Sequence, residues 1–167
     1  MTGLISFRGG GRFIDINHNE DEKIDYILSH YADYTKYATE REYFDYMATI
    51  DNALFALRSV EISKTAAAEK LIQLIPDYPW DSIKTELSHL ATKTSSSHNV
   101  LKFISAPARL EFLTALAIKS KLPGVEVIPN YPCDDEGLPT STAGGNNGDI
   151  ECFETTNSIL VEVTMAE

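Results

Sequence analysis

The last stretch of this chain, residues 148–164, constrains its fold more than any other feature of the sequence. It has the pattern of two short β-strands joined by a polar turn. In the second strand Ile159, Val161 and Val163 occupy every other position, and successive side chains of a strand point to opposite faces. The sequence therefore predicts that these three side chains form a buried apolar face. Glu162, which lies between two of them, is expected to point to the other face.

Two carboxylates stand out in this predicted pair of strands. Asp149 comes at the start of the first strand, and Glu162 lies inside the second. A carboxylate in an otherwise apolar strand is costly unless a cation meets it. Because carboxylate oxygens are the ligands that Mg²⁺ prefers, the two side chains are a candidate site for a divalent metal. The alternative is that Glu162 faces solvent on an edge strand and Asp149 is a turn residue.

A series of short motifs extends this pattern towards the N-terminus. They are VIPNY at 127–131, DDEGLPT at 134–140, AGGN at 143–146, DIEC at 149–152 and VEVT at 161–164. In this ordered series the chain resembles the AlwI-type restriction endonucleases, a branch of the PD-(D/E)xK nuclease superfamily. The resemblance is strongest from about residue 105 onward and looser at residues 11–17. It implies part of a type II restriction endonuclease that hydrolyses phosphodiester bonds of double-stranded DNA with Mg²⁺ as its cofactor.

The resemblance also implies a set of site residues. Family members carry a glutamate on the helix that precedes the sheet, and Glu111, in the segment LEFLTAL at 110–116, stands in the matching place. By this resemblance Glu111, Asp149 and Glu162 form a catalytic acidic cluster that binds the metal. From the residues alone, the alternative for Glu111 is an exposed glutamate without a partner, since no lysine follows it at helical spacing.

Two features depart from the superfamily pattern. The usual lysine two residues after the glutamate is replaced by Thr164, and the AlwI-type branch looks similar in this respect. Members of that branch use a further acidic position downstream, which this chain, ending at Glu167, does not contain. We therefore expect the 167 residues alone to be inactive, and to act with a second nuclease subunit or as a homodimer. The alternative is a non-catalytic helical interaction module that carries a degenerate, truncated nuclease remnant.

The overall charge bears directly on DNA binding. The chain has 25 acidic and 14 basic residues and a formal net charge of −11. Proteins that bind nucleic acids neutralise phosphates with clustered lysine and arginine. In an acidic chain, DNA binding must therefore come from missing segments, a partner chain or a few individual arginines. Arg8 and Arg12, on either side of three glycines, are the candidate DNA contacts. A flexible turn is the plainer interpretation of the glycine run.

Helical periodicity dominates residues 18–92. Asn19, Thr39 and Ser63 are each predicted to cap the start of a helix, and the segment 79–81 opens a fourth. In each case apolar side chains recur at helical spacing after the predicted start. This part of the chain is therefore predicted to be entirely helical.

The remaining organisation follows from the polar segment 94–97, which predicts a linker. The sequence thus predicts an α+β fold: a mainly helical domain at 1–97, followed at 98–167 by the N-terminal part of a restriction-endonuclease-like α/β core. A further helix begins near Ser105. The adjacent acids at 134–136 lie in a long irregular loop and are expected to be solvated.

The cysteines and the hydropathy bear on the cellular location. Cys133 and Cys152 are too few for a disulfide framework and are expected to be free thiols. No run of residues approaches the roughly 18 apolar residues of a membrane span. We therefore expect a cytoplasmic protein with no membrane partner.

Overall fold

The computed structural model describes residues 3–31, 36–57, 64–145 and 148–165. Within these residues the chain is α+β, as the sequence predicts, with five α-helices and two small antiparallel sheets. The predicted helix cap at Ser63 lies outside the described residues. Both cysteines are free thiols in the structure, in agreement with the prediction.

The N-terminal segment forms a β-hairpin. Strand β1 (Ile5–Arg8) pairs antiparallel with β2 (Phe13–Ile16). The glycines at 9–11 that join them have φ angles of 57°, 66° and 83°, a region that side chains with a Cβ rarely adopt. A Cβ on Gly11 would also lie 3.1 Å from the carbonyl oxygen of Asn99. The glycine run is therefore a tight turn that packs against the rest of the protein.

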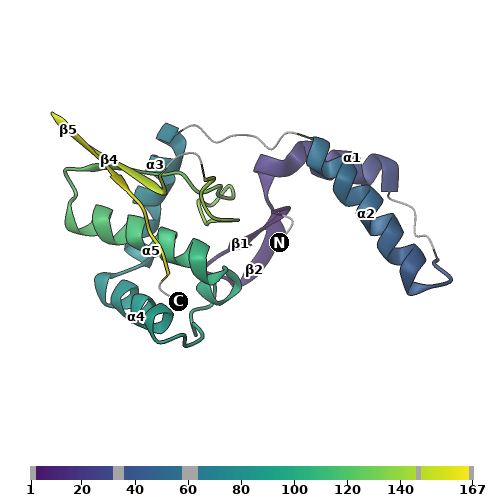
Figure 1. Cartoon of the computed structure of the whole chain (residues 1–167), viewed down its shortest axis with the longest axis horizontal. Helices are drawn as coiled ribbons and strands as arrows, with labels where there is room; N and C mark the ends of the chain where they lie inside the picture. The colour runs from purple at the N-terminus through teal and green to yellow at the C-terminus, as the bar shows by residue number, and fades with distance from the viewer. Residues whose placement is uncertain (1–2, 32–35, 58–63, 146–147, 166–167) are drawn as a thin grey trace.

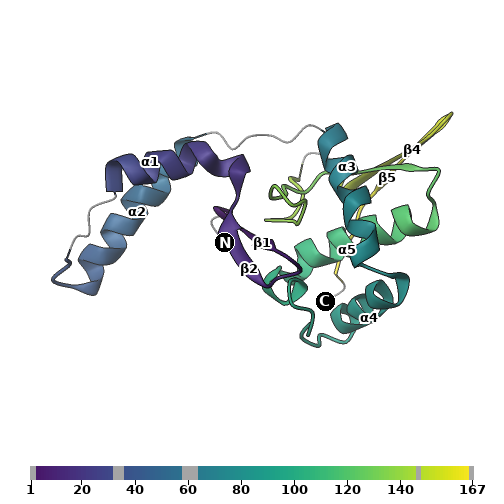
Figure 2. The ribbon, with the colours of Figure 1, turned by 180° about the vertical axis from the view of Figure 1, so that it is seen from behind.

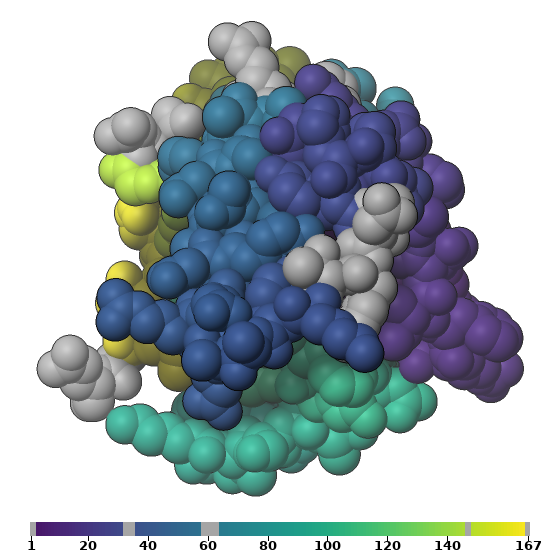
Figure 3. Space-filling model, turned by 90° about the vertical axis from the view of Figure 1, so that its right-hand side faces the viewer, coloured from purple at the N-terminus to yellow at the C-terminus, as the bar shows by residue number. Residues whose placement is uncertain are grey.

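Two helices follow at one end of the molecule, away from the larger sheet (Figure 1). They are α1 (Asp21–Tyr31) and α2 (Glu40–Ala56), and Figure 3 looks onto this end. The Thr39 side chain caps α2 as predicted. Tyrosines of the two helices contact each other. Within the described part of the chain α1 has no buried residue, and in α2 only Ile50 is buried.

The start of α1 differs from the prediction. Asn19 does not cap the helix, because it lies inside a short 3₁₀ turn, His18–Glu20, that precedes α1. The capping residue is Asn17, which has extended backbone angles and accepts a hydrogen bond from the Asn19 backbone N–H at 3.1 Å. The Asn17 side chain is fully buried and also binds the backbone carbonyl of Gly3 at 2.7 Å.

The hydrophobic core lies among the other helices and the larger sheet. Helices α3 (Lys64–Leu74), α4 (Trp80–Ala91) and α5 (Ala106–Lys121) all contribute to it. Its largest fully buried apolar side chains are Phe112, Leu71, Ile83, Leu101, Leu113, Leu116 and Ile150. One continuous core therefore extends across residue 97, where the sequence predicts a boundary between two domains.

The larger sheet has the strand order β3–β4–β5. Its strands are β3 (Glu126–Pro129), β4 (Ile150–Glu154) and β5 (Asn157–Val161), all antiparallel. Helices α3 and α5 both contact β3. The β4–β5 hairpin projects beyond the helices in both views of the ribbon (Figures 1 and 2). Because β4 is the central strand, its pairing with β5 fixes the position of the residues that follow β5, from residue 162 onward.

The apolar face predicted for the last strand is only partly buried. Val161 and Val163 pack against the core, but the side chain of Ile159 is 64% exposed. The prediction for Ile159 is wrong because β5 is an edge strand, and its first half lies on the projecting part of the hairpin. Leu160, on the opposite face, is 58% exposed.

Candidate functional site

Asp149 lies one residue before β4 and is held at three points. Its backbone N–H donates to the carbonyl of Val161 at 3.1 Å, and its own carbonyl accepts from the N–H of Asn130 at 2.9 Å. Its carboxylate oxygen Oδ2 accepts a short hydrogen bond, 2.6 Å, from the backbone N–H of Val163. Asp149 is thus bonded to the residues on both sides of Glu162, and this places the two acidic residues next to each other.

Glu162 lies one residue beyond the end of β5, not inside the strand as the sequence predicts. The last residue pair of the ladder is Ile150 with Val161. The ladder ends there because the Asp149 carboxylate takes the next N–H, that of Val163. The Glu162 side chain is exposed and makes no hydrogen bond or ion pair within the described residues. It is therefore free to bind a ligand.

Glu111 comes to the same region from helix α5. It is buried, with 5% of its surface exposed, and its Oε2 accepts a hydrogen bond from the backbone N–H of Ala143 at 2.8 Å. The alternative of an exposed glutamate without a partner is therefore wrong. Burial raises the pKa of Glu111; the Ala143 N–H acts against this, and the charges of Asp149 and Glu162 raise it further. Those two carboxylates thus lie close enough to act on Glu111 electrostatically.

The three carboxylates do not form a ready coordination shell. Among the residues that the structure describes, no group of three or more His, Cys, Asp or Glu side chains is arranged to hold a metal ion. Two of the three, Glu111 and Asp149, instead accept backbone N–H groups. The donor set nevertheless suits Mg²⁺, because its ligands are carboxylate oxygens, and because a buried carboxylate beside two others is stabilised by a cation.

Asn130 and Glu151 support this region, although the sequence interpretation gave them no role. The Asn130 side chain donates to the carbonyl of Gly148 at 2.7 Å and to Glu151 at 3.0 Å. Glu151 also forms an ion pair with Lys64 at the start of α3. These contacts connect β3, β4 and α3 around Asp149. Asn130 belongs to the VIPNY motif, which is the sequence feature that could have indicated a role for it. Its hydrogen-bond partners could not be predicted from the sequence.

Arg8, a predicted DNA contact, binds carboxylates of the protein itself. Its guanidinium lies 2.6 Å from Asp135, bonds to Glu136 and lies 3.6 Å from Asp15. It also donates to the carbonyl of Ile16 at 3.1 Å. Arg8 therefore fastens the N-terminal hairpin to the 134–138 loop, and its donors are used within the protein.

The acids of the 134–138 loop are not simply solvated, as the sequence predicted. Asp134 is 4% exposed and accepts hydrogen bonds from the backbone N–H groups of Glu136, at 3.0 Å, and Leu138, at 2.8 Å. Burial raises the pKa of Asp134, and these bonds act against that increase. The prediction failed because the hairpin covers this loop. In the structure Asp134 shapes the loop, and Asp135 and Glu136 bind Arg8.

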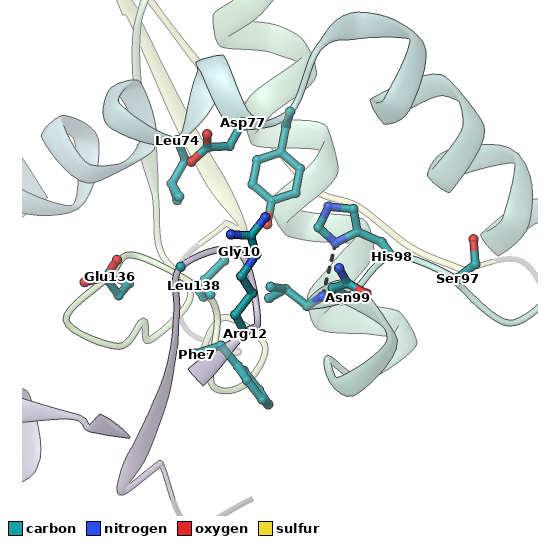
Figure 4. A pocket seen from close by; sticks show the side chains of 13 residues that line it. Phe7, Gly10, Arg12, Leu74, Asp77, Ser97, His98, Asn99, Glu136 and Leu138 are labelled. Carbon is teal, nitrogen blue, oxygen red and sulfur yellow. Dashed lines mark hydrogen bonds between the residues drawn. The ribbon is translucent and has the colours of Figure 1, made fainter. Parts of the chain in front are cut away.

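Arg12, the other predicted DNA contact, is exposed and lines a cavity of about 580 Å³ (Figure 4). The same cavity contains His98, Asp77 and Glu136, so its charges are mixed. Arg12 forms no ion pair within the described part of the chain, which leaves its guanidinium available. The structure does not bring Arg8 or Arg12 into the acidic cluster.

The comparisons with known proteins address the origin of this arrangement. A sequence model of the AlwI restriction endonuclease family matches residues 61–167, which is more than half of the chain. The chain belongs to the AlwI restriction endonuclease family. A search of curated proteins and a search of solved structures found no match. The matched segment contains all three acidic residues and, like the core, runs across residue 97. Membership of this family supports the role of a restriction endonuclease, an enzyme that acts on DNA.

The described helices also bear on the membrane. None of them is both long and apolar enough to cross a bilayer.

Proposed function

We propose that this chain carries the acidic centre of an AlwI-type endonuclease that hydrolyses phosphodiester bonds of duplex DNA with Mg²⁺. The observation that carries the proposal is that Asp149 is hydrogen-bonded to the residues on both sides of Glu162, and that the charges of Asp149 and Glu162 act on the buried Glu111. All three lie in the segment that matches the family. No basic partner offsets them within the described residues, so a cation is the natural complement.

Each residue has a distinct part in the proposal. Glu111, Asp149 and Glu162 would hold the metal, which when bound polarises a phosphate and increases the acidity of a water molecule. The N–H groups of Ala143 and Val163 donate to Glu111 and Asp149 and so orient these two carboxylates. Because Thr164 is uncharged, it cannot supply the positive charge of the superfamily's lysine. That charge must come from other groups around the phosphate.

The proposal is tested by nicking of supercoiled plasmid in Mg²⁺ by the full protein. Asp149→Ala and Glu162→Ala should each abolish cleavage, because each removes a carboxylate from the centre. Glu154→Ala is a matched control, since Glu154 is an exposed glutamate at the far end of β4. It should cleave as the unmodified protein does. Full cleavage by either of the first two variants would refute the assigned roles.

A second candidate function is a non-catalytic interaction module. The observation that favours it is the small burial of α1 and α2, which leaves Phe44 and Phe55 64% and 93% exposed. Large exposed apolar side chains of this kind often mark contact surfaces. In that case the acidic centre would neither bind Mg²⁺ nor support cleavage, and Asp149→Ala would change no activity.

The exposed edge strand β5 favours association with a partner chain under both candidate functions. In the part of the chain that the structure describes, its outer edge pairs with no other strand, and an unpaired edge can add a strand from another molecule. We therefore include a homodimer or a second nuclease subunit in the proposal. Light scattering at high protein concentration tests the homodimer, and a strictly monomeric mass would contradict it.

A further inference from the structure

A groove of about 630 Å³ lies between residues 102–107 and 139–142. The first segment leads into α5, and the second belongs to the long loop before β4. We propose that this groove holds a DNA backbone phosphate that neighbours the phosphate at the acidic centre. The inference rests on the proposed function and deepens it, since it assigns a path to the DNA strand.

The charge of the groove sets it apart from three other cavities in the described part of the chain. Those cavities contain the carboxylates Asp77, Asp81, Glu86 and Glu136 in their walls. The groove has no carboxylate, and its only charged wall residue is Lys102. In a chain with a net charge of −11, a polyanion meets the least repulsion where carboxylates are absent and a cation is present.

The groove also offers free hydrogen-bond donors. Lys102 is exposed, its Nζ lies 4.9 Å from the centre of the Phe103 ring, and it has no carboxylate partner within the described residues. The hydroxyl of Ser105 does not cap α5. The hydroxyl of Thr142 makes no hydrogen bond within the described residues. Lysine, serine and threonine side chains are common donors to DNA phosphates. The hydroxyls of Thr140 and Ser141 already donate to backbone carbonyls.

Both walls of the groove lead to the acidic centre. Pro107 lies four residues before Glu111 on α5, so the two residues share a face of the helix and are separated by about 6 Å along its axis. On the other wall, Thr142 directly precedes Ala143, whose N–H donates to Glu111. A DNA strand with one phosphate at the acidic centre can therefore place a neighbouring phosphate in the groove.

The test measures binding of a duplex oligonucleotide by the full protein at several salt concentrations, with Ca²⁺ in place of Mg²⁺. Lys102→Gln should weaken binding and reduce the slope of log K against log [salt] by about 0.9, the value for one lost phosphate contact. Ser105→Ala with Thr142→Ala should weaken binding and leave the slope unchanged. Lys36→Gln removes the same charge at the α1–α2 end and should match the unmodified protein. Equal thermal midpoints would confirm that all variants fold.

Two results would overturn the inference. One is an unchanged salt slope in Lys102→Gln, and the other is an equal change in Lys36→Gln. If plasmid cleavage still requires Asp149 in either case, only the groove assignment fails and the proposed function stands. If the unmodified protein neither binds nor cleaves DNA, the proposed function and the groove assignment both fail.

Discussion

Replacement of Arg8 by alanine should destabilise the protein markedly, because Arg8 joins the N-terminal hairpin to the 134–138 loop. Its side chain is 21% exposed and that of Asp135 is 14% exposed. Exposed ion pairs contribute at most about 1 kcal/mol, whereas breaking a buried pair costs about 3–5 kcal/mol. With exposure between these limits, Arg8→Ala should cost about 2 kcal/mol. For a chain of this length that corresponds to a decrease in Tm of roughly 4–8 °C.

Thermal unfolding followed by circular dichroism measures this effect, and Arg12→Ala is the matched control. Arg12 lies on the same hairpin but is exposed and forms no ion pair within the described residues, so its replacement should change stability by less than about 0.5 kcal/mol. If Arg8→Ala unfolds at the same temperature as Arg12→Ala and instead loses affinity for DNA, Arg8 is a DNA contact and our reasoning is wrong.

The effect of Arg8→Ala should also depend on pH. Burial alone would raise the pKa of Asp135, but hydrogen bonds from Arg8, Ser6 and the His18 N–H, together with the charge of Arg8, hold it below its ordinary value of 3.8. A lowered carboxyl pKa stabilises the folded protein fully above that ordinary value, and the contribution is lost as the pH falls through the lowered pKa. The stability difference between Arg8→Ala and the unmodified protein should therefore shrink below about pH 4.

Two further predictions concern the acidic centre. A Cβ at position 148 would lie 2.3 Å from the Leu160 Cγ, so Gly148→Ala should lower the free energy of unfolding, measured by chemical denaturation, by about 1–3 kcal/mol. The further change Leu160→Ala should recover part of this loss. Equal stability of Gly148→Ala and the unmodified protein would contradict the prediction. Burial raises the pKa of Glu111 above its ordinary 4.5, so its ionisation opposes folding as the pH rises. In the absence of metal, Glu111→Gln should therefore have a higher Tm than the unmodified protein at pH 7, but not at pH 4. A lower Tm for Glu111→Gln at pH 7 would refute it.

Features that depend on a few neighbouring residues were predictable from the sequence. Thr39 caps α2 as expected, because its hydroxyl reaches the N–H of Glu42 three residues later. Pro76 ends α3, since proline lacks the N–H that a continuing helix needs. The prediction that Glu111 joins the two strand-end carboxylates needed the resemblance to the family, because periodicity alone places Glu111 only on a helix.

Features that depend on distant partners could not be predicted. Arg8 and Asp135 are 127 positions apart, and no local pattern indicates that they form an ion pair. Alternation predicted a buried Ile159, but whether a strand face is covered depends on which helices reach it. The end of β5 at Val161 likewise depends on the Asp149 carboxylate, which takes the N–H of Val163.

Calorimetric titration with Mg²⁺, repeated with Mn²⁺, tests most directly whether the three carboxylates form one metal centre. We predict saturable binding to the unmodified protein, its loss in Asp149→Ala, and its retention in Glu154→Ala. Absence of binding to the unmodified protein, or equal binding to Asp149→Ala, would contradict the account.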